Sequence, residues 1–206
     1  MSTRIAAMGQ TMRKAPKQAR SRATVDAIVE AGTQVLGRRG WAGFTTNEVA
    51  EAAGVSIGSL YQYFPNKLSL IEALRRRHFD DVLGVLQAAS EDGRPLEESV
   101  GSLVQGMLAV HGSHPALHRA LLEETPRSEE TRSAHDAFDA QYLQHYKAIV
   151  ATHRTRRGAR RNDIAAQVVS AAIEGVVHHA ALNGLLDSPA LKKELVLLVC
   201  AYVRAP

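Results

Sequence analysis

Apolar positions recur at three- and four-residue intervals along most of the chain, and this spacing predicts helices. A first helix is expected over residues 20–38, with one face formed by Ala27, Ile28, Ala31, Val35 and Leu36. Thr45 and Glu48 then form a capping-box pattern, which predicts the start of a short second helix. Gly54 is expected to end that helix, because glycine tolerates the left-handed backbone of a tight turn.

The pattern continues with a third short helix from Ser56 to Phe64 and a longer helix capped by Asn66. Beyond these, a short piece follows Pro115, and longer helices are predicted over residues 95–111, 128–153, 162–185 and 188–204. No stretch has the alternation of a strand, and no segment repeats. We therefore expect an all-α fold of about nine helices.

Charge divides this helical chain unevenly. Residues 1–78 carry 12 Lys and Arg against 5 Asp and Glu, whereas residues 79–206 carry 13 against 16. This basic front suggests contact with a polyanion; the alternative is an uneven surface charge without a partner. We predict a flexible basic tail over residues 1–20, a small helical domain over residues 21–66 and a larger helical domain over residues 67–206.

Composition narrows the class of protein. Hydrophobic residues make up 45% of the chain, which is enough for a core, and Cys200 is the single cysteine. No apolar run approaches the roughly 18 residues that cross a bilayer, and the basic N-terminus lacks the apolar core of a signal peptide. These features predict a soluble protein of the reducing cytoplasm.

The two short helices and the Ala-Gly-Val-Ser segment between them have the pattern of a helix-turn-helix that reads DNA. Leu60 and Phe64 are four residues apart and are expected to face the core. The side chains that remain for solvent or DNA are Ser56, Gly58, Ser59, Tyr61, Gln62 and Tyr63. Gly58 costs up to about 1 kcal/mol inside a helix, and close approach to DNA explains that cost. The alternative is a surface amphipathic helix with its tyrosines packed sideways.

Residues 22–70 resemble the N-terminal domain of the TetR family of bacterial repressors. The matching stretches fall in order: Ala27–Leu36, Gly40-Trp41, Thr45-Thr46, Val49-Ala50, Ala53-Gly54-Val55-Ser56, Gly58-Ser59-Leu60-Tyr61, Tyr63-Phe64 and Lys67. The rest of the chain matches this family in length and helix content. The resemblance implies a dimeric regulator that a small molecule releases from a palindromic operator, and repression rather than activation.

The resemblance also assigns roles to individual residues. It implies phosphate contacts for Thr45, Thr46, Tyr61, Tyr63 and Lys67, and positions near base edges for Ser56, Ile57, Gly58, Ser59 and Gln62. Ile57 departs from relatives that carry a polar or basic residue there. It can touch a thymine methyl but cannot donate a hydrogen bond, so the base preference at that position stays open.

The last two helices each carry an apolar stripe that suits a dimer interface. The proposed interface residues are Ile164, Val168, Ala171, Gly175, Leu182, Leu191, Leu195, Leu198 and Tyr202. These stripes could instead be ordinary core. The family resemblance implies a four-helix interface, whose two-fold symmetry matches a palindrome.

The larger domain also has candidates for a small-molecule site, because apolar walls with a few polar groups suit such sites. The candidates are Met107, His111, Phe138, Tyr142, His145, Tyr146, Glu174 and His178. Plain core packing is the alternative for each apolar member, and Glu174 could instead be a contact between subunits.

Two rival functions are a metal sensor and a non-catalytic helical interaction protein. His111, His114 and His118 suggest a metal, but Pro115 interrupts them and no Cys or Asp completes a ligand set nearby. No nucleophile elbow, phosphate-binding glycine loop or His-Glu-x-x-His motif is present, so no enzyme and no cofactor is expected.

Overall fold

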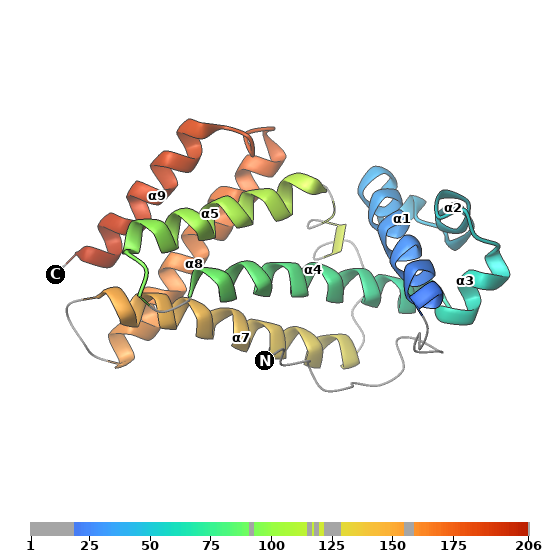
Figure 1. Cartoon of the computed structure of the whole chain (residues 1–206), viewed down its shortest axis with the longest axis horizontal. Coiled ribbons are helices and arrows are strands. Elements are labelled where there is room, and N and C mark those ends of the chain that lie inside the picture. Colours follow the sequence, from blue (N-terminus) through green and yellow to red (C-terminus); the bar gives the residue numbers. More distant parts are fainter. Residues whose placement is uncertain are drawn as a thin grey trace. The chain divides into compact units, whose positions relative to one another are not determined.

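The computed structural model describes residues 19–90, 93–114, 117, 120–121, 129–154 and 159–205. These residues form helices with no strand among them, which confirms the predicted all-α fold (Figure 1). The helices are α1 (Ala19–Gly43), α2 (Thr46–Ala52), α3 (Ile57–Tyr63), α4 (Lys67–Ala89), α5 (Leu96–Ser113), α7 (Glu129–His153), α8 (Ala159–Leu182) and α9 (Pro189–Arg204). The predicted tail and most of the short piece after Pro115 lie outside the described residues.

The chain divides into two compact units. An N-terminal unit comprises Met1–Arg76 and Ala120–Ser133, and a C-terminal unit comprises Arg77–Arg119 and Ala134–Pro206. Helix α4 contributes its first ten residues to one unit and the rest to the other. The predicted boundary after residue 66 marks the start of α4, whereas this division falls within the helix.

In the N-terminal unit, α2 packs against both α1 and α3, and α3 leads into the start of α4 (Figure 1). Helix α1 contains a kink at Gly40, whose backbone has φ 63° and ψ −179°. Because only glycine adopts this conformation readily, the regular first helix ends near the predicted position. Gly32 faces Leu74 of α4, and a Cβ atom at Gly32 would lie 3.1 Å from a Leu74 methyl.

In the C-terminal unit, α5 packs against α8 and α9, and α8 packs against α9. The buried core of this unit includes Leu86 of α4, Leu103 of α5, Tyr146 of α7 and Val169 of α8. Side chains from five helices thus share one core, since Val199 of α9 belongs to it as well.

Helix α8 differs from the expectation that no segment is apolar enough to cross a bilayer. Over Asn162–Leu182 it is long and apolar enough to cross a membrane by length and composition, and it is the one such helix in the described part of the chain. Ala165, Ala166, Val169, Ile173 and Val177 are nevertheless buried in the core, and a core helix meets the same criteria.

Gly106 allows α5 to approach α4 closely. A Cβ atom there would lie 2.5 Å from Cγ1 of Val85, which is closer than packed atoms tolerate. We predict that Gly106→Ala lowers the free energy of unfolding by about 1–3 kcal/mol, measured by urea denaturation. Gly101→Ala on the same helix is the control, because nothing lies within 4 Å of its added Cβ. Equal stability of the two variants would contradict the close approach.

Candidate nucleic-acid interface and polar cluster

Local caps fix the two short helices of the N-terminal unit. The Thr45 hydroxyl accepts a hydrogen bond from the Glu48 amide at 3.2 Å, and the Ser56 hydroxyl accepts one from the Ser59 amide at 3.1 Å. Between the helices, Gly54 has a φ of 66°, the left-handed conformation expected for the turn. The predicted caps and turn are confirmed.

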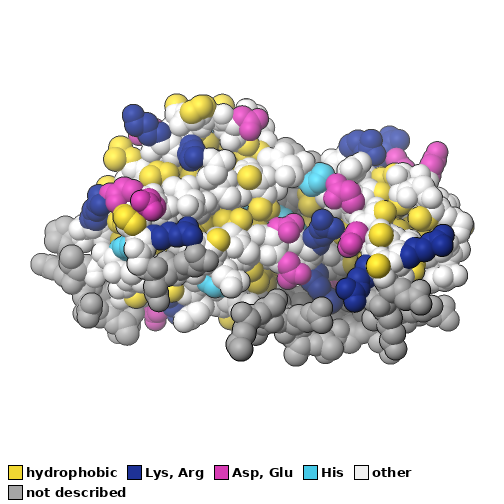
Figure 2. Space-filling view, in the orientation of Figure 1, with side chains coloured by type: hydrophobic (Ala, Val, Ile, Leu, Met, Phe, Trp, Pro, Cys, Tyr) yellow, Lys and Arg dark blue, Asp and Glu magenta, His cyan; other side chains and the backbone are white. Residues whose placement is uncertain are grey.

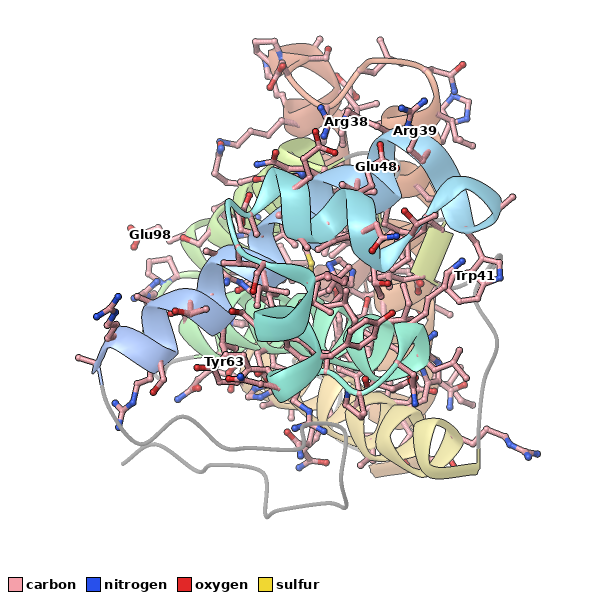
Figure 3. All side chains as sticks on the ribbon, turned by 90° about the vertical axis from the view of Figure 1, so that its right-hand side faces the viewer. Arg38, Arg39, Trp41, Glu48, Tyr63 and Glu98 are labelled. Carbon is pink, nitrogen blue, oxygen red and sulfur yellow. The ribbon has the colours of Figure 1, made fainter. Side chains whose placement is uncertain are left out.

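Helix α3 buries one side and exposes the other. Leu60 and the adjoining Phe64 are fully buried, as their spacing predicts. Ile57 is 37% exposed and Tyr61 is 41% exposed, although both are large and partly apolar. Gly58 and Gln62 are also exposed, while Ser59 and Tyr63 are half-buried. In Figure 3 the N-terminal unit faces the viewer, and Tyr63 of α3 is labelled.

Several hydroxyl groups on the two helices bind one another. The Tyr61 hydroxyl lies 3.0 Å from the Thr46 hydroxyl and joins α3 to the first turn of α2. The Ser56 and Ser59 hydroxyls lie 2.8 Å apart. One proton of each pair lies in the bond between the two oxygens, so these side chains have less capacity to bind DNA than the sequence suggests.

Among the residues that the structure describes, none requires glycine at position 58. Its φ is not positive, and the nearest atom to an added Cβ is the Ser56 hydroxyl at 3.9 Å. An alanine would fit here and would stabilise the helix. The described residues therefore leave room for a side chain at this position.

Lys67 lies against an aromatic ring. Its Nζ atom is 3.6 Å from the centroid of the Trp41 ring and donates a hydrogen bond of 2.9 Å to the Trp41 carbonyl. Partial burial lowers the pKa of Lys67. The ammonium group thus links α4 to the end of α1, and its predicted phosphate contact stays a prediction.

Charges around α3 come from other elements. Arg39 of α1 donates to the Glu48 carboxylate at 2.9 Å, so this carboxylate serves a tertiary ion pair (Figure 3). Figure 2 shows several Lys and Arg side chains over α1 to α3, mixed with Asp and Glu. Helix α3 itself carries no Lys, Arg, Asp or Glu.

The C-terminal unit contains a row of aromatic rings. Phe79 of α4 stacks on Phe138 of α7 with centroids 3.9 Å apart, and Tyr142 and Tyr146 continue the row at 5.5 Å and 5.0 Å. The two tyrosine hydroxyls form a hydrogen bond of 3.4 Å. Burial raises the pKa of Tyr142 to about 12 and also raises that of Tyr146 well above its ordinary value, so both stay protonated.

Acidic and imidazole groups adjoin this row. Partial burial and the Asp139 carboxylate raise the pKa of Glu174, whereas His178 and His135 oppose that shift. The negative charge of Glu174 in turn contributes to the raised pKa of Tyr142 and of Tyr146. The charge of His178 also lowers the pKa of His111. This imidazole is buried, and its Nδ1 atom lies 2.8 Å from the Met107 carbonyl oxygen. We use the name polar cluster for these acidic and imidazole groups together with the aromatic row. Its members are His111, His135, Asp139, Glu174 and His178, with Phe79, Phe138, Tyr142 and Tyr146.

Two further predicted ligand residues, His145 and Met107, have contacts of their own, and their proposed role stays a prediction. The His145 Nδ1 atom lies 3.0 Å from the Ser90 hydroxyl, at the end of α4. The Met107 side chain is buried in the hydrophobic core. The sequence analysis missed Phe79 and His78, whose ring lies 5.5 Å from that of His111. Their only signal is an aromatic pair within an otherwise charged stretch of α4.

Most of the predicted interface residues do face outward. Ile164, Val168, Leu182 and Leu198 are 45–58% exposed, and Ala171 and Gly175 are exposed beside them. Figure 2 shows hydrophobic side chains at the surface over α9. Leu191 and Tyr202 are half-buried.

Leu195 is a wrong prediction for this surface. It is 3% exposed and belongs to the core of its own chain, because it lies on the α9 face that also buries Val199. Leu197, which the sequence analysis did not select, is exposed next to Leu198.

No group of three or more His, Cys, Asp or Glu that could hold a metal ion occurs among the residues that the structure describes. His118 lies outside them. Cys200 is buried, and burial raises the pKa of its thiol, which disfavours the nucleophilic thiolate.

Two family models match the chain. The model for "Bacterial regulatory proteins, tetR family" covers residues 28–74, and that for "Tetracyclin repressor-like, C-terminal domain" covers residues 95–202. The uncharacterized HTH-type transcriptional regulator YvkB of Bacillus subtilis is 34% identical over 89 residues, which are 43% of this chain. The match spans 42% of the length of YvkB.

Solved structures share the fold over most of the chain at low sequence identity. A putative transcriptional regulator from Pseudomonas aeruginosa has a TM-score of 0.72 at 16% identity and covers 91% of both chains. The regulator FadR from Bacillus subtilis, solved in complex with stearoyl-CoA, has a TM-score of 0.67 at 18% identity. That match covers 84% of this chain and 96% of FadR.

Burial of His111 predicts how stability depends on pH. Burial and the nearby His178 lower its pKa below the ordinary 6.5, so below pH 6.5 the unfolded chain binds a proton that the folded chain does not. The free energy of unfolding should therefore decrease as the pH is lowered below 6.5, by at most about 1.4 kcal/mol per pH unit from this residue. His111→Gln should have a shallower slope in urea titrations between pH 7.5 and 5.5.

The exposed His179 provides the control for that slope. His179→Gln should keep the wild-type dependence on pH, since this side chain lies at the surface. If His111→Gln also kept it, His111 would not be the group that titrates.

Proposed function

Because the chain belongs to the TetR family of bacterial regulatory proteins, we propose that it binds operator DNA as a homodimer and represses transcription. A small molecule bound to the C-terminal unit would release it. We place this regulator in the cytoplasm, where its DNA is, and propose no enzymatic activity for it.

The observation that carries the DNA-binding part is the exposed side of α3 around Gly58. The chain accepts a helix-weakening residue at a position with free space on its own side. The DNA major groove admits one helix, and a glycine lets the helix backbone come closer to it. The surface-helix alternative gives no reason for this glycine.

The remaining contacts divide by chemistry. Ser56, Ile57, Gly58, Ser59 and Gln62 are proposed to lie near base edges, at the exposed side of α3. Thr45, Thr46, Tyr61, Tyr63 and Lys67 are proposed to position the domain on phosphates. The Tyr61–Thr46 hydrogen bond and the cation–π contact of Lys67 with Trp41 position these groups in the absence of DNA.

The domain roles follow from these sites. Residues 21–66 are proposed to form the DNA-binding domain, residues 67–206 the ligand-binding and dimerisation domain, and the basic residues 1–20 an arm that reaches the DNA. Removing the arm would then lessen the dependence of affinity on salt.

The exposed apolar stripe of α8 and α9 is proposed to form the dimer interface. It comprises Ile164, Val168, Ala171, Gly175, Leu182 and Leu198, together with Leu197. Small residues beside large ones let two helix pairs approach closely, and contiguous apolar surface of this kind marks interaction sites. Leu191 and Tyr202 would border it.

The polar cluster is proposed to hold or sense the ligand, with Phe138, Tyr142 and Tyr146 as its aromatic side and His111, Glu174 and His178 as orienting groups. A structural neighbour of this chain binds stearoyl-CoA, which shows that the fold can hold a ligand. A ligand releases DNA if it binds more tightly to a dimer geometry that fits the operator less well.

Substitution of Gly58 tests the DNA-binding face. Gly58→Ala should weaken binding to a palindromic fragment of the protein's own promoter by about tenfold or more, equal to about 1.4 kcal/mol. Its free energy of unfolding should stay the same or rise by up to about 1 kcal/mol, because alanine favours the helix. Electrophoretic mobility shifts and urea denaturation measure the two effects.

Gly84→Ala on α4 is the matched control, since it too is exposed with nothing near its added Cβ. It should bind DNA like the wild type. Wild-type affinity of Gly58→Ala would reject the proposed face.

Substitution of Leu198 tests the interface. Leu198→Asp should weaken dimerisation by at least about 100-fold, because each carboxylate would be buried without a partner. Ser102→Asp introduces the same charge at an exposed position of α5 and should leave the dimer intact. Analytical ultracentrifugation distinguishes the two, and a Leu198→Asp dimer of wild-type affinity would refute this interface.

A further inference from the structure

Helix α3 lacks the residues that read G·C pairs by direct contact. It contains no Arg or Lys, the usual partners of guanine O6 and N7, and no Asp or Glu, which accept from cytosine N4. Its sequence is Ile-Gly-Ser-Leu-Tyr-Gln-Tyr. Base recognition by this helix must therefore use uncharged groups.

The hydroxyl groups of this region are largely engaged within the protein. Ser56 caps α3 through the Ser59 amide and shares a hydrogen bond with the Ser59 hydroxyl. The Tyr61 hydroxyl is held at the Thr46 hydroxyl, on α2. Apart from Tyr61, whose hydroxyl is engaged, the exposed side chains of α3 are the aliphatic one of Ile57 and the amide of Gln62.

Ile57 lies at the end of α3 that a recognition helix directs toward base edges, and Gln62 lies one turn beyond Gly58. Ile57 is the first residue of α3, and the N-terminal residues of a recognition helix contact base edges. Next to it, the open space at Gly58 permits close approach of the backbone. Gln62 follows Gly58 by one helical turn, so both residues lie on the same side of α3.

We propose that α3 selects A·T pairs in each half-site, with Ile57 packed on a thymine C5 methyl group and Gln62 bound to the N6 and N7 atoms of an adenine. An exposed aliphatic side chain gains free energy only where apolar surface covers it, and thymine supplies the one methyl group of the major groove. The Gln62 amide can donate one N–H to adenine N7 while its carbonyl oxygen accepts from the N6 amino group. This inference rests on the proposed DNA binding.

The test for Ile57 removes one methyl group at a time from the DNA. Each thymine of the promoter fragment is replaced by deoxyuridine, and affinity is measured for the wild type and for Ile57→Ala. At one position per half-site, the replacement should weaken wild-type binding by about fourfold, the factor expected for burial of one methyl-sized group. Ile57→Ala should bind both fragments equally, because its partner for the methyl group is gone.

A parallel cycle tests Gln62. Replacing one adenine by 7-deazaadenine, which lacks N7, should weaken wild-type binding by about tenfold and leave Gln62→Ala unaffected. Both side chains are exposed, so the variants should fold like the wild type, which circular dichroism checks.

The outcomes separate the two levels of the proposal. If the wild type binds the fragment but each base change costs wild type and variant alike, the assignment to Ile57 and Gln62 is wrong while DNA binding stands. If the wild type binds no DNA, the proposed function fails and this inference fails with it. Loss of the methyl effect in Ile57→Ala alone, and of the N7 effect in Gln62→Ala alone, supports it.

Discussion

A helix of seven residues does not hold its shape in water by itself, because fixing its first turn costs more than its few hydrogen bonds return. Helix α3 exists because Leu60 and Phe64 are fully buried in the N-terminal unit. That burial fixes which side of α3 faces out, and the Thr46–Tyr61 bond fixes its angle to α2. The proposed DNA-reading surface is the side of α3 that stays exposed after Leu60 and Phe64 are buried.

Much of this arrangement could be predicted from sequence because its causes are local. The caps of Thr45, Ser56, Asn66 and Ser188 each bind an amide three residues ahead, so the pattern is visible within one turn. The left-handed turn at Gly54 is equally local. The burial of Leu60 and Phe64 follows from helical spacing.

The details that could not be predicted depend on residues far apart in the chain. The contact of Lys67 with Trp41 joins residues 26 apart in the chain. The stacking of Phe79 on Phe138 joins two helices whose packing no local pattern reveals. Leu195 and Leu198 show the same limit. Both fit an apolar stripe of α9, but only the packing of α5 and α8 decides which one is buried.

In the proposed complex, two copies of this chain each present α3 to one half of a symmetric DNA site. Selection of bound duplexes from a random DNA library measures this arrangement. We expect enrichment of an inverted repeat, with half-sites on one face of the duplex about 34–36 Å apart, or a multiple of that distance. Enrichment of a single unrepeated site, or of no sequence at all, would contradict it.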